Sequence, residues 1–155
     1  MGARVKITLT AEGRRFEQML RELSGLEVRI GFQHGEEEEN GTDICDIAMW
    51  NELGTKNAPS RPFLRKSVDE NMGRIDDFLQ AQKQGILRGD SARQILNRIG
   101  IFQKDLIQEK ITEGSFVPNA ASTIRKKKSD KPLIDTGRMR QSVNYVIRRK
   151  GESSE

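Results

Sequence analysis

Several potential metal-binding side chains stand close together in the first third of the chain. His34 is followed by four glutamates at positions 36–39, then by Asp43 and Cys45. Imidazole, thiolate and carboxylate groups all bind transition metals. However, one histidine and one cysteine make a poor zinc set, and glutamates in a flexible loop are not preorganised as ligands. The sequence therefore predicts no metal site and no cofactor.

No set of residues has the spacing of a catalytic site. The only histidine, His34, lies beside a loop of like charges and has no defined partner to orient it in a Ser-His-Asp arrangement. Glycine-rich phosphate-binding loops are absent. Asp76 and Asp77 are adjacent carboxylates, as in metal-dependent nucleases, but such a pair on the flank of a helix is common. We expect no enzyme activity and no small-molecule substrate.

Hydrophobic periodicity and capping residues predict the elements that carry these side chains. Two alternating segments predict strands near the N-terminus, a third predicts a closing strand, and Asp43 and the Ser91–Gln94 capping box begin helices that end at Gly54 and Gly114. Gly85 and Gly89 are expected to break the helix that begins near Pro62, and Asp135 or Thr136 to cap a brief one. The predicted elements are strands 5–10, 26–32 and 143–148, helices 11–25, 43–54, 62–86, 91–114 and 136–141, and loops 35–42 and 116–132.

This order of strands and helices lacks the βαβ rhythm of a doubly wound sheet. It predicts an α+β fold, with a small, mainly antiparallel sheet packed against several helices. Residues 1–150 are expected to form a single domain with an acidic loop at 35–42, and residues 151–155 a disordered tail. The sole tryptophan, Trp50, is expected to be buried.

Composition favours an oligomer over a free monomer. Only 34% of the 155 residues are hydrophobic and 32% are charged, so a modest core suffices only if further faces are buried between subunits. The single cysteine excludes an intrachain disulfide and is consistent with a reducing compartment. Because no long apolar run is present, we expect no association with a membrane. We expect the protein to assemble in a cytoplasm.

Two short stretches are rich in residues that fix backbone shape. The first runs through Asn51-Glu52-Leu53-Gly54-Thr55 and continues in Pro59-Ser60-Arg61-Pro62-Phe63; the second is Pro132-Leu133-Ile134-Asp135-Thr136-Gly137-Arg138. Glycine reaches positive φ, proline locks φ, and Ser or Thr can cap neighbouring amides. We expect a rigid helix-to-helix corner in which Gly54 adopts the left-handed conformation and Glu52 pairs with Arg61 or Arg65. The Phe63 ring is expected in the core, with a subunit anchor as the alternative.

The order and spacing of these stretches resemble phage head–tail joining proteins, the HK97 gp10-like neck and tail-completion family. In that family a helix ending in an Asn-Glu-aromatic/aliphatic-Gly-Thr turn leads into a Pro-x-Arg-Pro-Phe helix start, and a Pro-Leu-Ile-Asp-Thr-Gly segment closes the domain. The resemblance spans residues 28–147. The chain departs from the pattern in its inserted residues 56–58 and in lacking a tryptophan-bearing stretch before Pro132.

The resemblance implies a structural virion protein that forms a homo-oligomeric ring at the head–tail junction of a tailed phage. Its partners would be the head connector or head-closure protein and the tail terminator or tail tube proteins. A tail terminator that caps the tail tube is the alternative within the same class. The residues that the resemblance places at subunit contacts are Asn51, Glu52, Gly54, Thr55, Pro59, Arg61, Pro62, Phe63, Pro132, Leu133, Asp135, Thr136, Gly137 and Arg138.

The positive charge of the chain is local. Residues 1–122 hold 17 Lys/Arg against 19 Asp/Glu, whereas residues 123–150 hold 10 against 2. A solvated loop, non-specific contact with packaged DNA and contact with an acidic partner are all open for this segment. A small basic nucleic-acid-binding protein is accordingly the alternative from another class, and its candidate contacts are Arg125, Lys126, Lys127, Lys128 and Lys131.

Overall fold

The computed structural model describes residues 7–35, 38–39, 41–118, 125 and 137–152. The chain begins with helix α1 (Ala11–Gly25) and strand β1 (Leu26–Gly31), followed by the short strands β2 (Glu38–Glu39) and β3 (Thr42–Asp43). Four helices come next: α2 (Ile44–Leu53), α3 (Phe63–Asp69), α4 (Met72–Arg88) and α5 (Ala92–Glu113). Helix α7 (Arg138–Gln141) and strand β4 (Asn144–Arg149) complete the described part. The predicted α+β class is confirmed.

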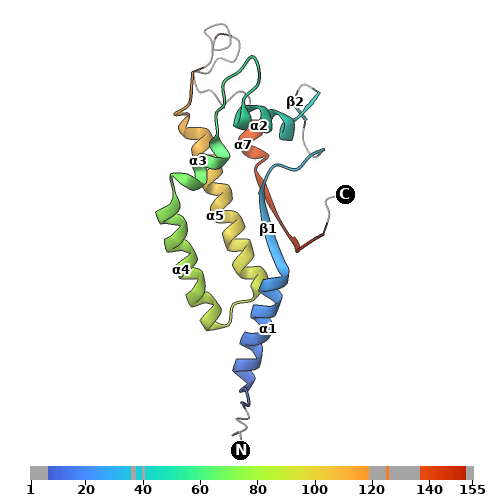
Figure 1. The fold of residues 1–155 in the computed structure, drawn as a ribbon, viewed down its shortest axis with the longest axis vertical. Helices are drawn as coiled ribbons and strands as arrows, with labels where there is room; N and C mark the ends of the chain where they lie inside the picture. The colour runs from blue at the N-terminus through green and yellow to red at the C-terminus, as the bar shows by residue number, and fades with distance from the viewer. Residues whose placement is uncertain (1–6, 36–37, 40, 119–124, 126–136, 153–155) are drawn as a thin grey trace, which may run out of the picture.

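The long helix α5 is the centre of the molecule (Figure 1). It contacts both strands of the main sheet and also α1, α3, α4 and α7. The main sheet is an antiparallel pair of β1 and β4, in register from Leu26 opposite Arg149 to Gly31 opposite Asn144. The ring of Tyr145 lies against the backbone of α5, where a Cβ on Gly100 would stand 2.4 Å from it. Glycine at this position therefore lets the helix approach the sheet closely.

The core lies mainly at the end of the molecule where α2, α3 and α7 meet α5. Its buried residues come from all four of these helices and from the residue before β4: Ile44, Ala48, Phe63, Ile107, Ile111, Met139 and Val143. A smaller cluster of Leu26, Ala92 and Leu96 holds the start of β1 against the start of α5. At that end of the molecule α1 extends away from the body (Figure 1).

Most helices begin and end at residues whose types favour helix caps. Thr10, Asp43 and Ser91 are N-caps, and Ser91 and Gln94 form the reciprocal capping box. Gly89 and Gly114 end α4 and α5 in the left-handed conformation, as expected of C-terminal glycines.

Two of the predicted elements and one predicted helix break are wrong. Residues 7–10 form no strand, and Ile7 is 81% exposed. The predicted helix 62–86 is two helices, because the Asn71 side chain bonds the Ser67 carbonyl (3.0 Å) and interrupts the helical ladder between α3 and α4. Gly85 breaks nothing: it lies inside α4, where the Asp90 carboxylate packs against its backbone.

The remaining differences are local. Part of the predicted acidic loop 35–42 forms the β2–β3 pair, with Glu38 opposite Asp43. The N-cap of α7 is Gly137 rather than the predicted Asp135 or Thr136, which lie outside the described residues. In the predicted tail 151–155, the Glu152 carboxylate accepts a hydrogen bond from the backbone amide of Arg149 at 3.2 Å, and residues 153–155 lie outside the described residues.

Candidate assembly interface

Gly54 ends α2 and turns the chain toward α3. Its amide donates to the Trp50 carbonyl at 2.8 Å, and its backbone angles are φ 77° and ψ 170°. The prediction of a left-handed helical conformation at Gly54 is therefore wrong, because ψ lies far from the left-handed helical value. The φ and ψ values observed lie in a region of the Ramachandran map that is open essentially to glycine alone. A Cβ here would stand 2.7 Å from the Ser60 amide nitrogen, so the turn depends on glycine sterically as well.

The residues after Gly54 form a tight loop that returns to α2. Thr55 and Ala58 exchange backbone hydrogen bonds of 2.9 and 3.3 Å, which places the inserted residues 56–58 in a small hairpin. The Ser60 hydroxyl then donates to the Glu52 carbonyl at 2.7 Å, and the Arg61 amide donates to the Asn51 carbonyl at 2.6 Å. Since both bonds end on α2, the loop is held to the helix that it leaves.

Glu52 caps the next helix. Its carboxylate accepts hydrogen bonds from the amides of Leu64 (2.8 Å) and Arg65 (3.1 Å) in the first turn of α3. The N-cap residue of α3 is Pro62, whose side chain makes no capping bond. The predicted ion pair of Glu52 with Arg61 or Arg65 is wrong: no ion pair between described residues involves Glu52. Amides at a helix N-terminus bind a carboxylate for the same reason that they bind other anions.

Arg61 is buried rather than presented to a partner. Its side chain is 6% exposed, and its Nε donates to the Val117 carbonyl at 2.9 Å. Burial lowers the pKa of this guanidinium from its usual value, although an arginine stays charged at neutral pH. Arg61 thus fastens the corner to the segment that follows α5.

Phe63 is fully buried and packs edge-to-face on Phe32 with ring centroids 6.0 Å apart. Its core assignment is confirmed, and a role as an exposed subunit anchor is excluded for this ring. Of the residues predicted at the first contact, Thr55 and Pro59 are exposed, whereas Asn51, Glu52, Gly54 and Pro62 are partly buried. The corner is therefore a rigid support that leaves few of its own side chains free for contact.

The outer face of α2, beside this corner, is apolar. Met49 is 48% exposed, Trp50 47% and Leu53 66%. Ile44 and Ala48 on the inner face belong to the core, so α2 is apolar on opposite sides. The predicted burial of Trp50 is wrong within this chain. Apolar periodicity does not predict this face, because it assigns every apolar residue of a short helix to one core. The small number of polar residues in α2 is the sequence feature that could have indicated a second apolar face.

Helix α7, which begins at the last residue of the second motif, lies against α2. Met139 of α7 shares the core cluster of Ile44 and Phe63. Gly137 has φ 81° and ψ −3°, the left-handed conformation, and Arg138 is exposed. The structure thus brings Gly137 and Arg138 to the end of the molecule that carries the corner. The other predicted residues of this motif, Pro132, Leu133, Asp135 and Thr136, lie outside the described residues.

Of the five candidate nucleic-acid contacts in the basic segment, Arg125 alone is among the described residues, and it is exposed. Lys126, Lys127, Lys128 and Lys131 lie outside the described residues.

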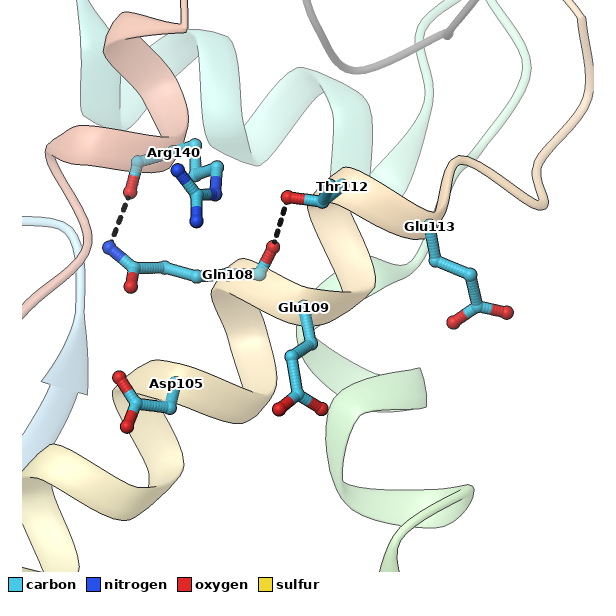
Figure 2. Close-up of a pocket in the computed structure, with 6 residues that line it drawn as sticks. All are labelled: Asp105, Gln108, Glu109, Thr112, Glu113 and Arg140. Carbon is cyan, nitrogen blue, oxygen red and sulfur yellow. Dashed lines mark hydrogen bonds between the residues drawn. The ribbon is translucent and has the colours of Figure 1, made fainter.

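A polar groove follows the exposed side of α5 (Figure 2). Asp105, Glu109 and Glu113 line it together with Gln108, Thr112 and Arg140. Gln108 donates to the Arg140 carbonyl at 3.0 Å, and Thr112 donates to the Gln108 carbonyl at 2.8 Å. The Gln108 bond joins α5 to α7, whereas the Thr112 bond lies within α5.

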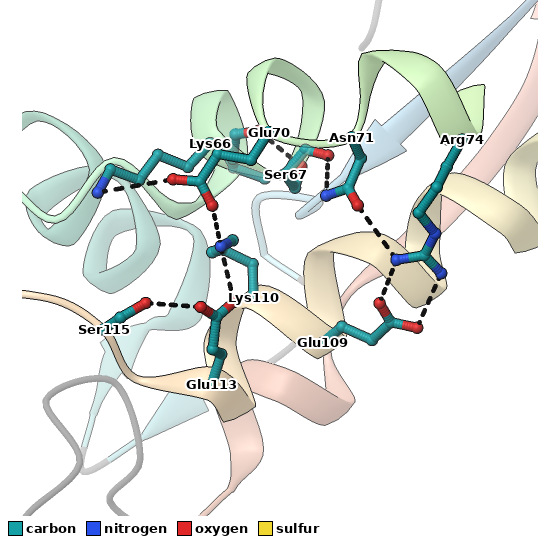
Figure 3. Close-up of polar contacts among 10 residues, drawn as sticks. Lys66, Ser67, Glu70, Asn71, Arg74, Glu109, Lys110, Glu113 and Ser115 are labelled. Carbon is teal, nitrogen blue, oxygen red and sulfur yellow. Dashed lines mark hydrogen bonds and ion pairs between the residues drawn. The ribbon is translucent and has the colours of Figure 1, made fainter. Parts of the chain in front are cut away.

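An ion-pair network joins α5 to α3 and α4 (Figure 3). Lys110 is 5% exposed and its ammonium group pairs with Glu70 and, at 2.7 Å, with Glu113. Burial lowers the pKa of Lys110, but its hydrogen bonds to both glutamates outweigh burial and leave the pKa raised. The bond from Lys110 lowers the pKa of Glu113. Beside this cluster, the Arg74 guanidinium of α4 pairs with the Glu109 carboxylate of α5 at 2.8 Å.

The residues considered for metal binding are engaged with one another. Asp43 accepts bonds from the amides of Gly35 (2.6 Å) and Cys45 (2.8 Å), which lower its pKa, and lies 3.1 Å from His34 Nδ1. Burial raises the pKa of the Cys45 thiol, which disfavours the thiolate form that binds metals. Across the described residues no three His, Cys, Asp or Glu side chains are grouped so as to hold a metal ion.

Within the described part of the chain, no helix is both long enough and apolar enough to span a membrane. Comparison with known proteins found no matching family model, no matching curated protein and no matching solved structure.

Proposed function

We propose that this chain is a structural subunit of a tailed phage particle that forms a ring at the head–tail junction, linking the portal-connector complex to the tail. It acts by assembly and carries no catalysis. The proposal starts from the sequence resemblance over residues 28–147, to which the geometry of the corner adds support. The alternative position within the same particle is that of a tail terminator that caps the tail tube.

The proposal is supported mainly by the exposed apolar face of α2. Met49, Trp50 and Leu53 together present two large aliphatic side chains and the sole tryptophan to solvent. Contiguous exposed apolar side chains mark protein–protein contacts, and tryptophan is enriched among the residues that dominate binding energy. A neighbouring subunit or ring that covers this face would remove it from water.

The corner supplies the rigidity that such a contact needs. Glu52, one residue before Leu53, is bonded to two amides of α3, and Gly54, one residue after it, occupies a conformation that only glycine adopts. A surface held in one geometry loses little conformational entropy on binding. Glu52 and Gly54 therefore support the proposed contact on the outer side of α2 without lying on that side themselves.

A charge introduced on this face tests the proposal. Leu53→Lys places a charge at its centre, and Ile101→Lys is the matched control because Ile101 is 50% exposed on α5. We expect cells that produce only the Leu53→Lys chain to accumulate separate heads and tails in electron micrographs, whereas Ile101→Lys yields joined particles. Joined, infectious particles with Leu53→Lys would contradict the proposal.

A further inference from the structure

The β1–β4 sheet has only two strands in the described part of the chain. Two-stranded ribbons are marginally stable alone, and each strand of a pair leaves one edge without a partner strand. Here α5 covers one face of the ribbon, which accounts for its stability but leaves its edges unpaired. An edge of this kind is a template for a strand from another chain.

The hydrogen-bond pattern shows which edge is open. The amides of Tyr145 and Arg149 on β4 point away from β1, because they donate to the side chains of Asn144 (2.9 Å) and Glu152 (3.2 Å). The outer edge of β4 is thus partly occupied. Tyr145 lies opposite Ile30, so by the alternation of an antiparallel pair the backbone groups of Val28 and Ile30 point outward from β1. The Val28–Ile30 stretch is therefore the open edge.

A strand-like segment stands exposed at the other end of α1. Residues 5–10 alternate apolar and polar side chains, Val-Lys-Ile-Thr-Leu-Thr. Ile7 is 81% exposed, Leu9 is 42% exposed, and residues 7–10 belong to no strand or helix. The same alternation holds in β1, where Val28 and Ile30 pack against the core clusters while Glu27 and Arg29 point to the opposite face. The two segments match as neighbours in one sheet.

This segment cannot reach β1 of its own chain. Thr10 caps α1, whose 15 residues separate it from β1 by about 22 Å at 1.5 Å per residue. Ile7 lies only three residues before Thr10, within about 10 Å even when fully extended. Because α1 is a continuous helix, Ile7 and Leu9 stay far from Val28. A strand donated to this edge must therefore come from another chain, and a second copy of this chain carries a segment with the matching alternation.

We propose that residues 7–10 of one subunit pair with the open edge of β1 in the next subunit and form the third strand of its sheet. Ile7 and Leu9 then lie on the α5 side of the partner's sheet, and Thr8 lies on the opposite face. The contact uses a different surface on each copy, so it is heterologous and closes a ring when the rotation between copies permits. The inference rests on the proposed function only in that copies of this chain associate.

Substitutions in the donated segment test the pairing. We expect Ile7→Asp to weaken self-association of the full-length protein at least tenfold, measured as molar mass by light scattering across a concentration series. Thr8→Asp is the matched control and retains association, because its side chain faces away from α5. Association that is unchanged by Ile7→Asp, or weakened equally by both substitutions, overturns the inference.

Cross-linking tests the acceptor. On a Cys45→Ser background, one tagged chain carries Thr8→Cys and a second, differently tagged chain carries Arg29→Cys or Glu27→Cys. Side chains on the same face of neighbouring strands lie about 5 Å apart at Cβ, which is close to disulfide distance. A disulfide joining the two tags at one of these positions is expected after mild oxidation. Its absence at both positions overturns the inference.

The two proposals fail separately. A cross-link in a protein that is absent from tailed particles leaves the donated strand standing and removes the phage assignment. A ring at the junction that forms equally well with Ile7→Asp supports the phage assignment and removes the donated strand.

Discussion

The Glu52 carboxylate on the last turn of α2 lies 2.8 Å from the amide nitrogen of Leu64 in the first turn of α3. This bond joins two helices across the loop that Gly54 opens. It makes the end of α2, the start of α3 and the exposed Leu53 side chain between them parts of one rigid unit.

Removal of the Glu52 carboxylate should destabilise the fold. Glu52→Ala leaves two amides of α3 without their acceptor, and loss of a helix cap costs about 0.5–2 kcal/mol. Glu52→Gln keeps an acceptor oxygen and should lose less. Urea unfolding measures both, with the exposed Glu22→Ala on α1 as a control that changes little. Equal stabilities for Glu52→Ala and Glu22→Ala would contradict the capping role.

Alanine at Gly54 and at Gly73 should act in opposite directions. At Gly54 the backbone has φ 77°, and a Cβ would stand 2.7 Å from the Ser60 nitrogen, so Gly54→Ala should cost about 1–3 kcal/mol. Gly73 lies inside α4 with open space around it, so Gly73→Ala should stabilise the protein by about 0.5–1 kcal/mol. Thermal unfolding of the pair decides this, and two shifts of the same sign would be inconsistent with the geometry.

The contact between Gly100 and Tyr145 predicts an overpacking effect. A Cβ on Gly100 would lie 2.4 Å from the Tyr145 ring, so Gly100→Ala should destabilise by about 1–3 kcal/mol even though alanine favours helices. Tyr145→Leu removes the ring, and in that background Gly100→Ala should cost less. A double-mutant cycle that shows additive effects would rule out this contact.

Much of this architecture is predictable because it is local. Thr10, Asp43 and Ser91 bond amides two or three residues away, and β1 and β4 show their alternation within six residues each. Local patterns also correctly predict the α+β class and the burial of Phe63.

The wrong predictions concern residues whose structure depends on groups that are far away in the sequence. The bond from Arg61 to Val117 spans 56 residues, and no local pattern reveals it. Residues 7–10 have the alternation of a strand, but a strand needs a partner edge, and α1 holds this segment away from its own. The sequence predicts a buried Trp50 because large aromatic side chains are mostly buried, and no local pattern indicates that this side chain is 47% exposed.

The Lys110 network should make stability depend on pH at both extremes. The pKa of Glu113 is lowered by its bond from Lys110, so the stability it contributes is present above its unfolded pKa near 4.5 and is lost as pH falls through the lower folded value. The pKa of Lys110 is raised, so its contribution is present below about pH 10.5 and is lost as pH rises through the folded value.

Lys110→Met tests this coupling. Methionine fills the buried site without a charge, and the Glu113 pKa, followed by carboxyl-carbon NMR during an acid titration, should rise toward its ordinary value. Glu12, on α1, serves as a reference outside the network. A Glu113 titration that is the same with and without Lys110 would show that the pair does not couple.

We propose that another subunit covers the outer face of α2 in a ring at the head–tail junction. Electron cryo-microscopy of tailed particles made by the cells that encode this chain tests it most directly. We expect a ring of this chain between portal and tail, with Met49, Trp50 and Leu53 against a neighbouring subunit. Particles that lack the chain, or a ring in which these three side chains face solvent, would contradict it.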